Sequence, residues 1–384
     1  MKARTKLVFA SDSLKGSLSS KRAGELLRLA AENVFGECET IILPIADGGE
    51  GTMDAVLSLG RGEKVMVPAH DPLNRPMEGT YVRLSEQEAL IEMAAVSGLT
   101  LLSPEERNPL FTTTCGVGEL IRDALKNGCN RIIIAIGGSA TNDGGMGCMQ
   151  ELGIRFRDVN GTELSGAGKN LVEIASIDTS GIVREVKEAK FTVMCDVTNP
   201  LCGQNGATMV YGPQKGGTPE ILQELEAGMV NFRDIIRNTF GMDCDHIQGA
   251  GAAGGLGAAL KVFLGAEMRS GIQTLLDLVH FDDLIRDADL IVTGEGRADA
   301  QSCQGKVMQG IGLRAVKCGI PVYGLCGTVE PEAEALKNQG ITALYSVKPD
   351  SMPLQEAMER AEELYLSAAE KMFLRYRGDK KKEC

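Results

Sequence analysis

Short apolar runs alternate with amphipathic helical stretches along almost the whole of this chain. The clearest run, RIIIAI at residues 131–136, is bounded by polar residues and glycines, which indicates a strand buried on both faces. Strands that alternate with helices form mainly parallel sheets covered by helices on both faces. The sequence therefore predicts an α/β protein built on doubly wound sheets.

The same two patterns place the other elements. Residues 19–35 have the apolar spacing of a helix, and Ser19 is placed to cap it. Residues 89–95 could be strand or helix, because a short apolar run does not distinguish the two. We expect further helices at residues 118–127, 219–240, 253–264 and 354–376, and strands at residues 6–11, 40–45, 64–68, 190–195, 289–293, 321–326 and 341–347.

The chain length suggests two domains. A chain of 384 residues exceeds what one hydrophobic core usually serves. The segment DPLNRP at residues 71–76 interrupts regular structure, since each proline also restricts the residue before it. We expect a discontinuous doubly wound domain from residues 1–75 and 285–384, with a second α/β domain inserted at residues 76–284.

Composition argues against several classes of partner. The net charge is -12, whereas a nucleic-acid surface needs a basic footprint. Tryptophan is absent and aromatic residues make up 4% of the chain, which disfavours base-stacking platforms. No apolar run approaches the ~20 residues that span a bilayer. We therefore expect small-molecule substrates and no nucleic-acid or membrane partner.

The cysteines indicate a reducing compartment. Eleven cysteines are scattered without a CxxC pair, and three histidines leave few ligands for a zinc site. The apolar part of the N-terminal segment MKARTKLVFASDS is too short for a signal peptide. We expect a cytoplasmic protein with reduced thiols.

Glycine- and acid-rich clusters follow five of the predicted strands. Ligands of open parallel sheets collect at the carboxyl ends of strands, where these clusters would lie. Any one cluster could be a simple turn, but five together favour a ligand site. The clusters occupy residues 11–17, 47–52, 137–145, 196–200 and 293–297.

Phosphate is the ligand that such clusters suit best. Glycine lets backbone N–H groups approach a phosphate closely, and Lys15, Lys215 and Lys306 are candidate countercharges. The Walker pattern GxxxxGK[ST] is missing, so any phosphate is held in another way. GAGAAG at residues 249–254 matches GxGxxG, but the polar residues before it do not form a convincing strand. An NAD-dependent hydroxy-acid oxidoreductase therefore remains an alternative, as does a non-catalytic sensor of sugar acids.

The clusters, taken in order, closely resemble the type I glycerate kinase family of bacteria. The resemblance extends over roughly 300 residues and ten ordered segments, which makes it far more specific than any single motif. The segments are SDSLKGSLS (11–19), PIADGGEGT (44–52), DPLNRP (71–76), EMAAVSGL (92–99), TTTCGVGELI (112–121), IGGSATNDGGMG (136–147), CDVTNPLCG (195–203), YGPQKGG (211–217), GAGAAGGLGAAL (249–260) and TGEGRADAQS (293–302).

This resemblance implies a flavodoxin-like domain and a second domain likened to restriction-endonuclease folds, with the active site in the cleft between them. It implies phosphorylation of D-glycerate that depends on ATP and Mg²⁺. The usual product in this family is 2-phosphoglycerate, formed in organic acid and glyoxylate metabolism, and 3-phosphoglycerate is the less expected product.

The residue roles are hypotheses within that pattern. Asp196 is the general base or a metal ligand, or simply caps the turn that follows it. Lys15 and Asp47 are further catalytic candidates, and Asp299 is the other metal candidate. For Arg75, a contact to the glycerate carboxylate competes with a solvated loop position. The remaining substrate candidates are Ser11, Asp12 and Glu50, and the nucleotide candidates are Gly137, Gly138, Ser139, Asn142, Asp143 (or a helix cap), Lys215, Glu295 and Lys306.

Overall fold

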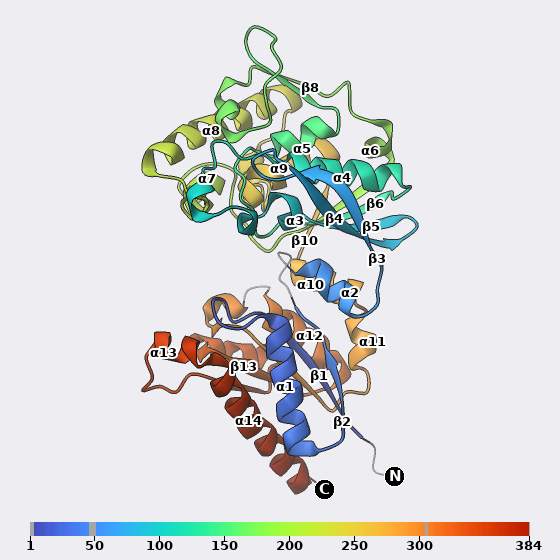
Figure 1. The fold of residues 1–384 in the computed structure, drawn as a ribbon, viewed down its shortest axis with the longest axis vertical. Helices are drawn as coiled ribbons and strands as arrows, with labels where there is room; N and C mark the ends of the chain where they lie inside the picture. The colour runs from blue at the N-terminus through green and yellow to red at the C-terminus, as the bar shows by residue number, and fades with distance from the viewer. Residues whose placement is uncertain (1–3, 46–50, 304–305, 384) are drawn as a thin grey trace. The chain divides into compact units, whose positions relative to one another are not determined.

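The computed structural model describes residues 4–45, 51–303 and 306–383 (Figure 1). The chain divides into two compact units. The first unit contains residues 1–47, 54–59 and 272–384, and the second contains residues 48–53 and 60–271. The chain therefore leaves the first unit, builds the second and returns, which is the connectivity of an inserted domain.

The first unit is built on a five-stranded parallel sheet. Its strand order is β15-β13-β11-β1-β2, and every neighbouring pair is parallel. The central strands β1 and β11 are almost wholly buried, which explains their continuous apolar sequence. The strands are β1 (Thr5–Ser11), β2 (Cys38–Ile42), β11 (Leu290–Gly294), β13 (Val322–Cys326) and β15 (Ala343–Ser346), so all five expected strands of this sheet are confirmed.

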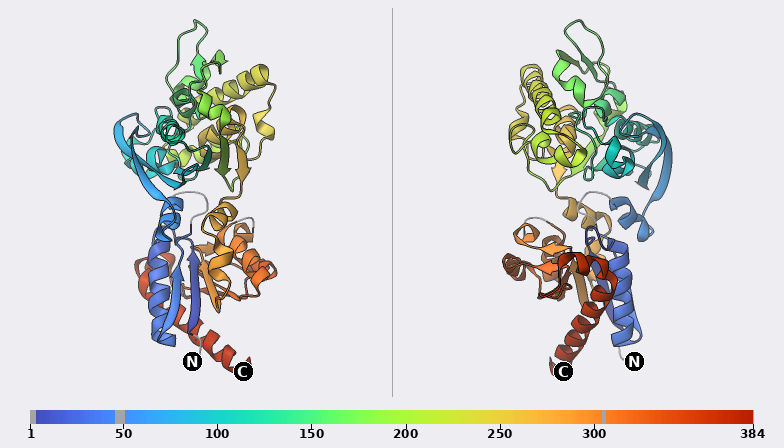
Figure 2. Two further views of the ribbon diagram at one scale, coloured as in Figure 1. Left: turned by 90° about the vertical axis from the view of Figure 1, so that its right-hand side faces the viewer. Right: turned by 60° about the vertical axis from the view of Figure 1, so that its left-hand side comes forward.

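Helices cover both faces of this sheet. Helices α1 (Ser20–Phe35) and α14 (Ala361–Glu383) lie side by side and share one core with alternate residues of the central strands (Figures 1 and 2). Helix α12 (Val307–Cys318) contacts β1, β11 and β13, and its buried residues lie outside that core, so it covers the opposite face. The Ser19 side chain accepts a hydrogen bond from the Arg22 N–H, which confirms the predicted cap.

The second unit contains a mixed six-stranded sheet in the order β10-β9-β6-β5-β4-β3. The pairs from β10 to β5 are parallel, whereas β4 runs antiparallel to both of its neighbours. The strands are β3 (Glu63–His70), β4 (Pro76–Ser85), β5 (Glu88–Glu92), β6 (Arg131–Ala135), β9 (Lys190–Met194) and β10 (Glu267–Arg269).

The expected domain boundaries at residues 75 and 285 are both displaced. Strand β3 pairs with β4 along its whole length, from Glu63 opposite Arg83 to His70 opposite Pro76, and so belongs to the second sheet. The segment at residues 71–76 is the turn of this hairpin rather than a domain break. The chain crosses near residue 60 and returns at residue 272.

Three predicted elements differ in detail. The ambiguous run at 89–95 is both strand and helix, since β5 is followed by α3 (Ala94–Ser97). The run at 253–264 is a tight turn, η6 (Ala252–Gly255), before α9 (Leu256–Leu264). The last predicted helix is divided into α13 (Leu354–Glu359) and α14.

The remaining elements are shorter or connect the sheets. Helices α4 (Cys115–Lys126) and α8 (Pro219–Phe240) confirm two further predictions. The others are α2 (Thr52–Ser58), α5 (Met146–Glu151), α6 (Arg184–Glu188), α7 (Ala207–Tyr211), α10 (Gly271–Leu278), α11 (Phe281–Ile285), β7 (Arg155–Arg157), β8 (Ser176–Asp178), β12 (Arg297–Ala298) and β14 (Thr328–Val329).

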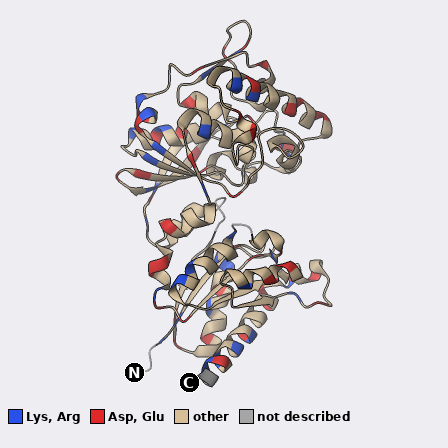
Figure 3. Ribbon diagram, turned by 180° about the vertical axis from the view of Figure 1, so that it is seen from behind, with Lys and Arg blue, Asp and Glu red and all other residues tan. Residues whose placement is uncertain are grey.

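Charged residues of both signs are distributed through both units (Figure 3). Among the described residues, no helix has the length and apolar character needed to cross a bilayer. The ten described cysteines are all free thiols.

Candidate active site

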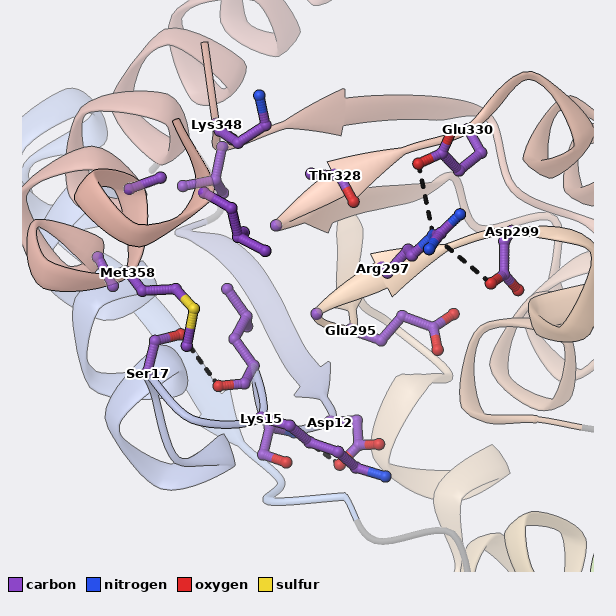
Figure 4. A pocket seen from close by; sticks show the side chains of 18 of the residues that line it. Asp12, Lys15, Ser17, Glu295, Arg297, Asp299, Thr328, Glu330, Lys348 and Met358 are labelled. Atoms are coloured by element: carbon purple, nitrogen blue, oxygen red, sulfur yellow. Dashed lines mark hydrogen bonds and ion pairs between the residues drawn. The ribbon is translucent and has the colours of Figure 1, made fainter. Parts of the chain in front are cut away.

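A pocket of about 530 Å³ lies in the first unit, where β1, β11, β13 and β15 end. Its lining comes from the segments that follow these four parallel strands, together with the starts of α12, α13 and α14. This is the position expected for a ligand site in an open parallel sheet, and the volume is in the range that holds a small-molecule ligand. Figure 4 shows the pocket.

One wall of the pocket carries charged side chains. Asp12 and Lys15 come from the segment after β1, Glu295 and Asp299 from the segment after β11, and Lys306 from the N-terminus of α12. The structure thus brings together five residues that the sequence assigned to substrate, catalysis, metal or nucleotide. Both signs are present, so the wall can contact a phosphate and a cation at once.

Glu295 is a largely buried acid of this wall. Burial raises the pKa of its carboxyl group, while the Ser302 hydroxyl and the Lys306 charge oppose the shift. Its Oε1 atom is buried and has no hydrogen-bond partner among the described residues. A buried carboxylate oxygen without a partner is costly, which makes it a candidate ligand for a cation or a donor group.

The opposite wall of the pocket is mainly apolar, although Thr328 and Lys348 also line it. Met358 lies across the pocket from Asp299 (Figure 4). Sequence reasoning missed this wall, although its residues follow predicted strands or begin a predicted helix, where ligands are expected. The lining residues that lay outside every predicted cluster and site assignment are Val307, Gly327, Thr328, Glu330, Val347, Lys348, Leu354, Ala357, Met358 and Ala361.

Ser11 is not part of this pocket lining, although it was a substrate candidate. It is the last residue of β1, and 3% of it is exposed. Its carbonyl oxygen accepts a hydrogen bond from the Ser20 hydroxyl at 2.5 Å, which ties the strand end to α1. Side chains alternate between faces along a strand, so Ser11 faces the core while Asp12 turns toward the pocket.

The glycine-rich segment at residues 137–145 lies in the second unit and begins where β6 ends. Gly137 and Ser139 are partly exposed and Gly138 is exposed, so their backbone can meet a ligand. Asn142 and Asp143 are fully buried instead. The two halves of this segment therefore differ in what they can bind.

The carboxylate of Asp143 accepts several hydrogen bonds inside the second unit. Its Oδ2 atom accepts from the N–H and the hydroxyl of Thr114, at 2.8 and 2.7 Å, and from the Gly147 N–H at 3.2 Å. Its Oδ1 atom accepts from the Gly145 N–H at 3.1 Å. Burial raises the pKa of Asp143, and these donors oppose that shift. The sequence left open that Asp143 caps the next helix, and its hydrogen bonds to the Gly145 and Gly147 N–H groups at the start of α5 match that alternative.

Lys215 is buried as well, with 2% exposed. Its Nζ atom donates to Ser139 Oγ at 2.8 Å and to Thr141 O at 2.6 Å. Burial lowers its pKa to about 7, and Asp143 partly opposes the shift. In this structure Lys215 therefore supports the segment at residues 137–145 from inside the unit.

Asp196 and Arg75 are already engaged by the protein. Asp196 lies two residues after the end of β9, and its Oδ1 atom accepts a hydrogen bond from the Gly271 N–H at 2.9 Å. Arg75 donates from Nε to Asp71 and from Nη1 to Glu106, both at 2.6 Å, and these bonds raise its pKa. About half of the Arg75 side chain is exposed, so one edge of the guanidinium still meets solvent.

Asp47 and Glu50 lie outside the described residues. The segment that follows them is held by Glu92, which sequence reasoning missed. Glu92 Oε1 accepts from the Gly51 N–H at 2.8 Å, and Oε2 accepts from the Met53 N–H at 3.1 Å. The sequence held one clue to Glu92, because it is a charged residue at the end of an apolar run. In the fold only 5% of Glu92 is exposed.

The GxGxxG match at residues 249–254 packs against the protein's own backbone. A Cβ atom on Gly254 would lie 2.1 Å from the Thr141 carbonyl oxygen, and one on Gly251 would lie 2.2 Å from the Pro200 carbonyl oxygen. The segment also follows a short 3-10 turn rather than a strand. These glycines therefore serve close packing within the unit, and the sequence basis for NAD binding is removed.

Comparisons with known proteins find one family. The model of the family described as "Glycerate kinase family" matches residues 7–377. The glycerate kinase of Bacillus subtilis (strain 168) is 42% identical over 359 residues, which cover 93% of this chain and 94% of that protein. The glycerate 2-kinase of Escherichia coli (strain K12) is 40% identical over 357 residues, with 93% and 94% covered.

A solved structure has the same fold. It is a crystal structure of a proposed glycerate kinase 2 from Salmonella typhimurium LT2, which aligns with a TM-score of 0.81 at 39% sequence identity. The alignment covers 98% of this chain and 100% of that one.

Proposed function

Because this chain belongs to the glycerate kinase family, we propose that it transfers the terminal phosphoryl group of ATP to the 2-hydroxyl group of D-glycerate, giving 2-phosphoglycerate and ADP. The enzyme is thus a phosphotransferase with an alcohol acceptor. The single observation that carries this function is the family match over residues 7–377. The 2-position rests on the printed name of the Escherichia coli relative.

In this proposal, the pocket of the first unit binds the nucleotide. The apolar wall that includes Leu354 and Met358 suits the adenine base, which needs a flat apolar surface. Lys15 and Lys306 provide positive charge for the phosphates. The N-terminus of α12, which begins at Val307, adds a favourable helix dipole on the same side.

The same pocket fits a magnesium ion. Mg²⁺ prefers carboxylate oxygens and shared phosphate oxygens, and Glu295 offers a buried oxygen that has no partner among the described residues. Asp299 and Glu295 would hold the ion, with Asp12 on the same wall. The ion would neutralise charge on the transferred phosphate.

The remaining roles stay predictions. Asp196 would accept the proton of the glycerate hydroxyl, since phosphoryl transfer to an alcohol needs a carboxylate placed for it. Its alternative role as a metal ligand stays open, as do the catalytic and substrate roles of Asp47 and Glu50. Arg75 would contact the glycerate carboxylate. The reaction would take place in the reducing cytoplasm.

A direct assay tests this function. The purified chain is mixed with D-glycerate, ATP and Mg²⁺, ADP release is followed, and the product is identified by phosphorus NMR. We expect ADP to form only when D-glycerate is present and the phosphate to sit on the 2-hydroxyl. Binding of glycerate without ADP release would instead indicate a sensor, and fluorescence enhancement of NADH would favour an oxidoreductase.

A further inference from the structure

Three side chains with different donor atoms meet in the second unit, in a place that the proposed reaction does not use. His70 is the last residue of β3, Cys115 is the first residue of α4, and Glu119 lies one turn further along α4. One ligand atom from each lies within 4.8 Å of the others. A thiol, an imidazole and a carboxylate so close together are the donor set of a zinc site.

Close backbone packing fixes these three side chains. A Cβ atom on Gly116 would lie 2.3 Å from the His70 carbonyl oxygen, so the start of α4 sits directly against the end of β3. A Cβ atom on Gly118 would lie 2.5 Å from the Cys148 carbonyl oxygen and 2.6 Å from Glu151 Cβ. These glycines bring β3, α4 and α5 together, so the donor atoms converge without a change in the backbone.

Hydrogen bonds already orient the donors. Glu119 Oε2 accepts from the His70 backbone N–H, and Glu119 Oε1 lies at the His70 ring atom Nδ1, both at 2.8 Å. Cys115 Sγ donates a hydrogen bond to Glu151 Oε1 at 3.5 Å, so the thiol is also held by a residue of α5. The other Glu151 oxygen pairs with Arg122 at 2.7 Å, and this pairing fixes the direction of the carboxylate.

The surroundings of this cluster favour a cation. Burial raises the pKa of the Cys115 thiol, and the charges of Glu151 and Glu119 raise it further. A divalent ion would offset the repulsion between thiolate and carboxylates, and its binding would release the thiol proton.

We propose that His70, Cys115 and Glu119 form a zinc-binding site with three protein ligands. The sulfur and nitrogen donors select Zn²⁺ over Mg²⁺, which prefers oxygen alone. The site would clamp the end of β3 to the start of α4. Thr114, next to Cys115, is bonded to Asp143, so bound zinc would also stabilise the segment at residues 137–145. This site is independent of the kinase assignment.

Cobalt titration tests the site, because Co²⁺ occupies zinc sites and reports thiolate ligation by a near-ultraviolet charge-transfer band. The full-length protein is titrated with Co²⁺ in a buffer that contains a phosphine reductant, which keeps the cysteine thiols reduced. We expect this band to saturate at one ion per chain, to strengthen as pH rises, and to disappear when Zn²⁺ is added. Zn²⁺ should also raise the melting temperature.

Variants separate the site from other thiols. Cys115→Ser should abolish the band, and His70→Asn and Glu119→Gln should each weaken metal affinity by about 10-fold or more. Cys318→Ser is the matched control, because Cys318 is an exposed free thiol in the first unit, and it should behave as wild type. Circular dichroism checks that each variant is folded. A wild-type protein without the band, or a folded Cys115→Ser variant that retains it, would overturn the proposal.

Discussion

The Nζ atom of Lys215 lies 2.6 Å from the carbonyl oxygen of Thr141, in a site where 2% of the lysine is exposed. A lysine this deeply buried keeps its charge only at a cost in free energy, and burial lowers its pKa to about 7. Lys215 therefore changes its charge near neutral pH while it supports the glycine-rich segment at residues 137–145.

Replacement of this lysine should change how stability depends on pH. Between pH 7 and about pH 10, Lys215 is mostly neutral in the folded protein but protonated in the unfolded chain. The unfolded state then binds more protons, so this residue makes the free energy of unfolding rise with pH. The rise is at most about 1.4 kcal/mol per pH unit. Lys215→Met should remove this contribution, as measured by urea unfolding at pH 7 and pH 9.

The control for that experiment is Lys187→Met, since Lys187 is an exposed lysine of α6 in the same unit. It should retain the wild-type slope. An unchanged slope in Lys215→Met would mean that Lys215 keeps its charge in the folded protein.

Asp196→Asn should lower kcat by a factor on the order of 10² or more, because an amide cannot accept the hydroxyl proton. The amide oxygen can still accept the Gly271 N–H, so the melting temperature should stay close to that of the wild type. Asp178→Asn, at an aspartate of β8 in the same unit, serves as the control. Near-normal turnover would remove Asp196 from the mechanism.

Arg75→Ala should raise the KM for glycerate by roughly 10- to 100-fold, which corresponds to one lost charged hydrogen bond. The KM for ATP should change much less. Arg83→Ala provides a comparison, since the Arg83 guanidinium contacts backbone carbonyl groups at the far end of the β3–β4 hairpin. Equal effects on both KM values would indicate that Arg75 acts only through Asp71 and Glu106.

Leu354→Asp should raise the KM for ATP by roughly 5- to 50-fold, because it removes apolar contact with the base and adds a negative charge. Leu354 is 62% exposed, so the change should not disturb the core. The control is Leu374→Asp on α14, at a leucine that is 47% exposed and outside the pocket lining. If both variants bind ATP equally well, the base lies elsewhere.

Glu295→Gln should increase the Mg²⁺ concentration that gives half-maximal activity by about 10-fold, because a neutral amide is a weaker ligand for a hard cation. The glutamine keeps the size of the side chain and leaves the fold unchanged. The measurement is ADP formation titrated with Mg²⁺ at saturating ATP. A Mg²⁺ requirement equal to that of the wild type would place the ion on other residues.

The fold of the first unit was largely predictable. Its central strands are buried on both faces, so their sequences are continuously apolar, and all five of its strands were expected. The polar groups at their carboxyl ends, such as Lys15, Glu295 and Lys306, were also found, because sheet topology alone brings those ends to one edge. The apolar wall that includes Met358 was not, since it depends on how α13 packs over the sheet.

The second unit shows where sequence reasoning stops. Strand β4 has only a partly apolar pattern, and its antiparallel pairing moved β3 out of the first domain. Asp143 and Lys215 resemble ligand residues in sequence, but Thr114 and Thr141 hold them inside the protein. Burial of this kind depends on partners far apart in the chain, which no local pattern reports.

By itself, the sequence determined the α/β class, the glycerate kinase family and the strand ends where ligands collect. Tertiary structure alone decided which polar residues face a pocket and which are buried. It also brought His70 to Cys115 across 45 residues of chain, through close packing at Gly116. The physical reason is that periodicity and composition record local preference, whereas desolvation and hydrogen bonding depend on neighbours that only the folded chain supplies.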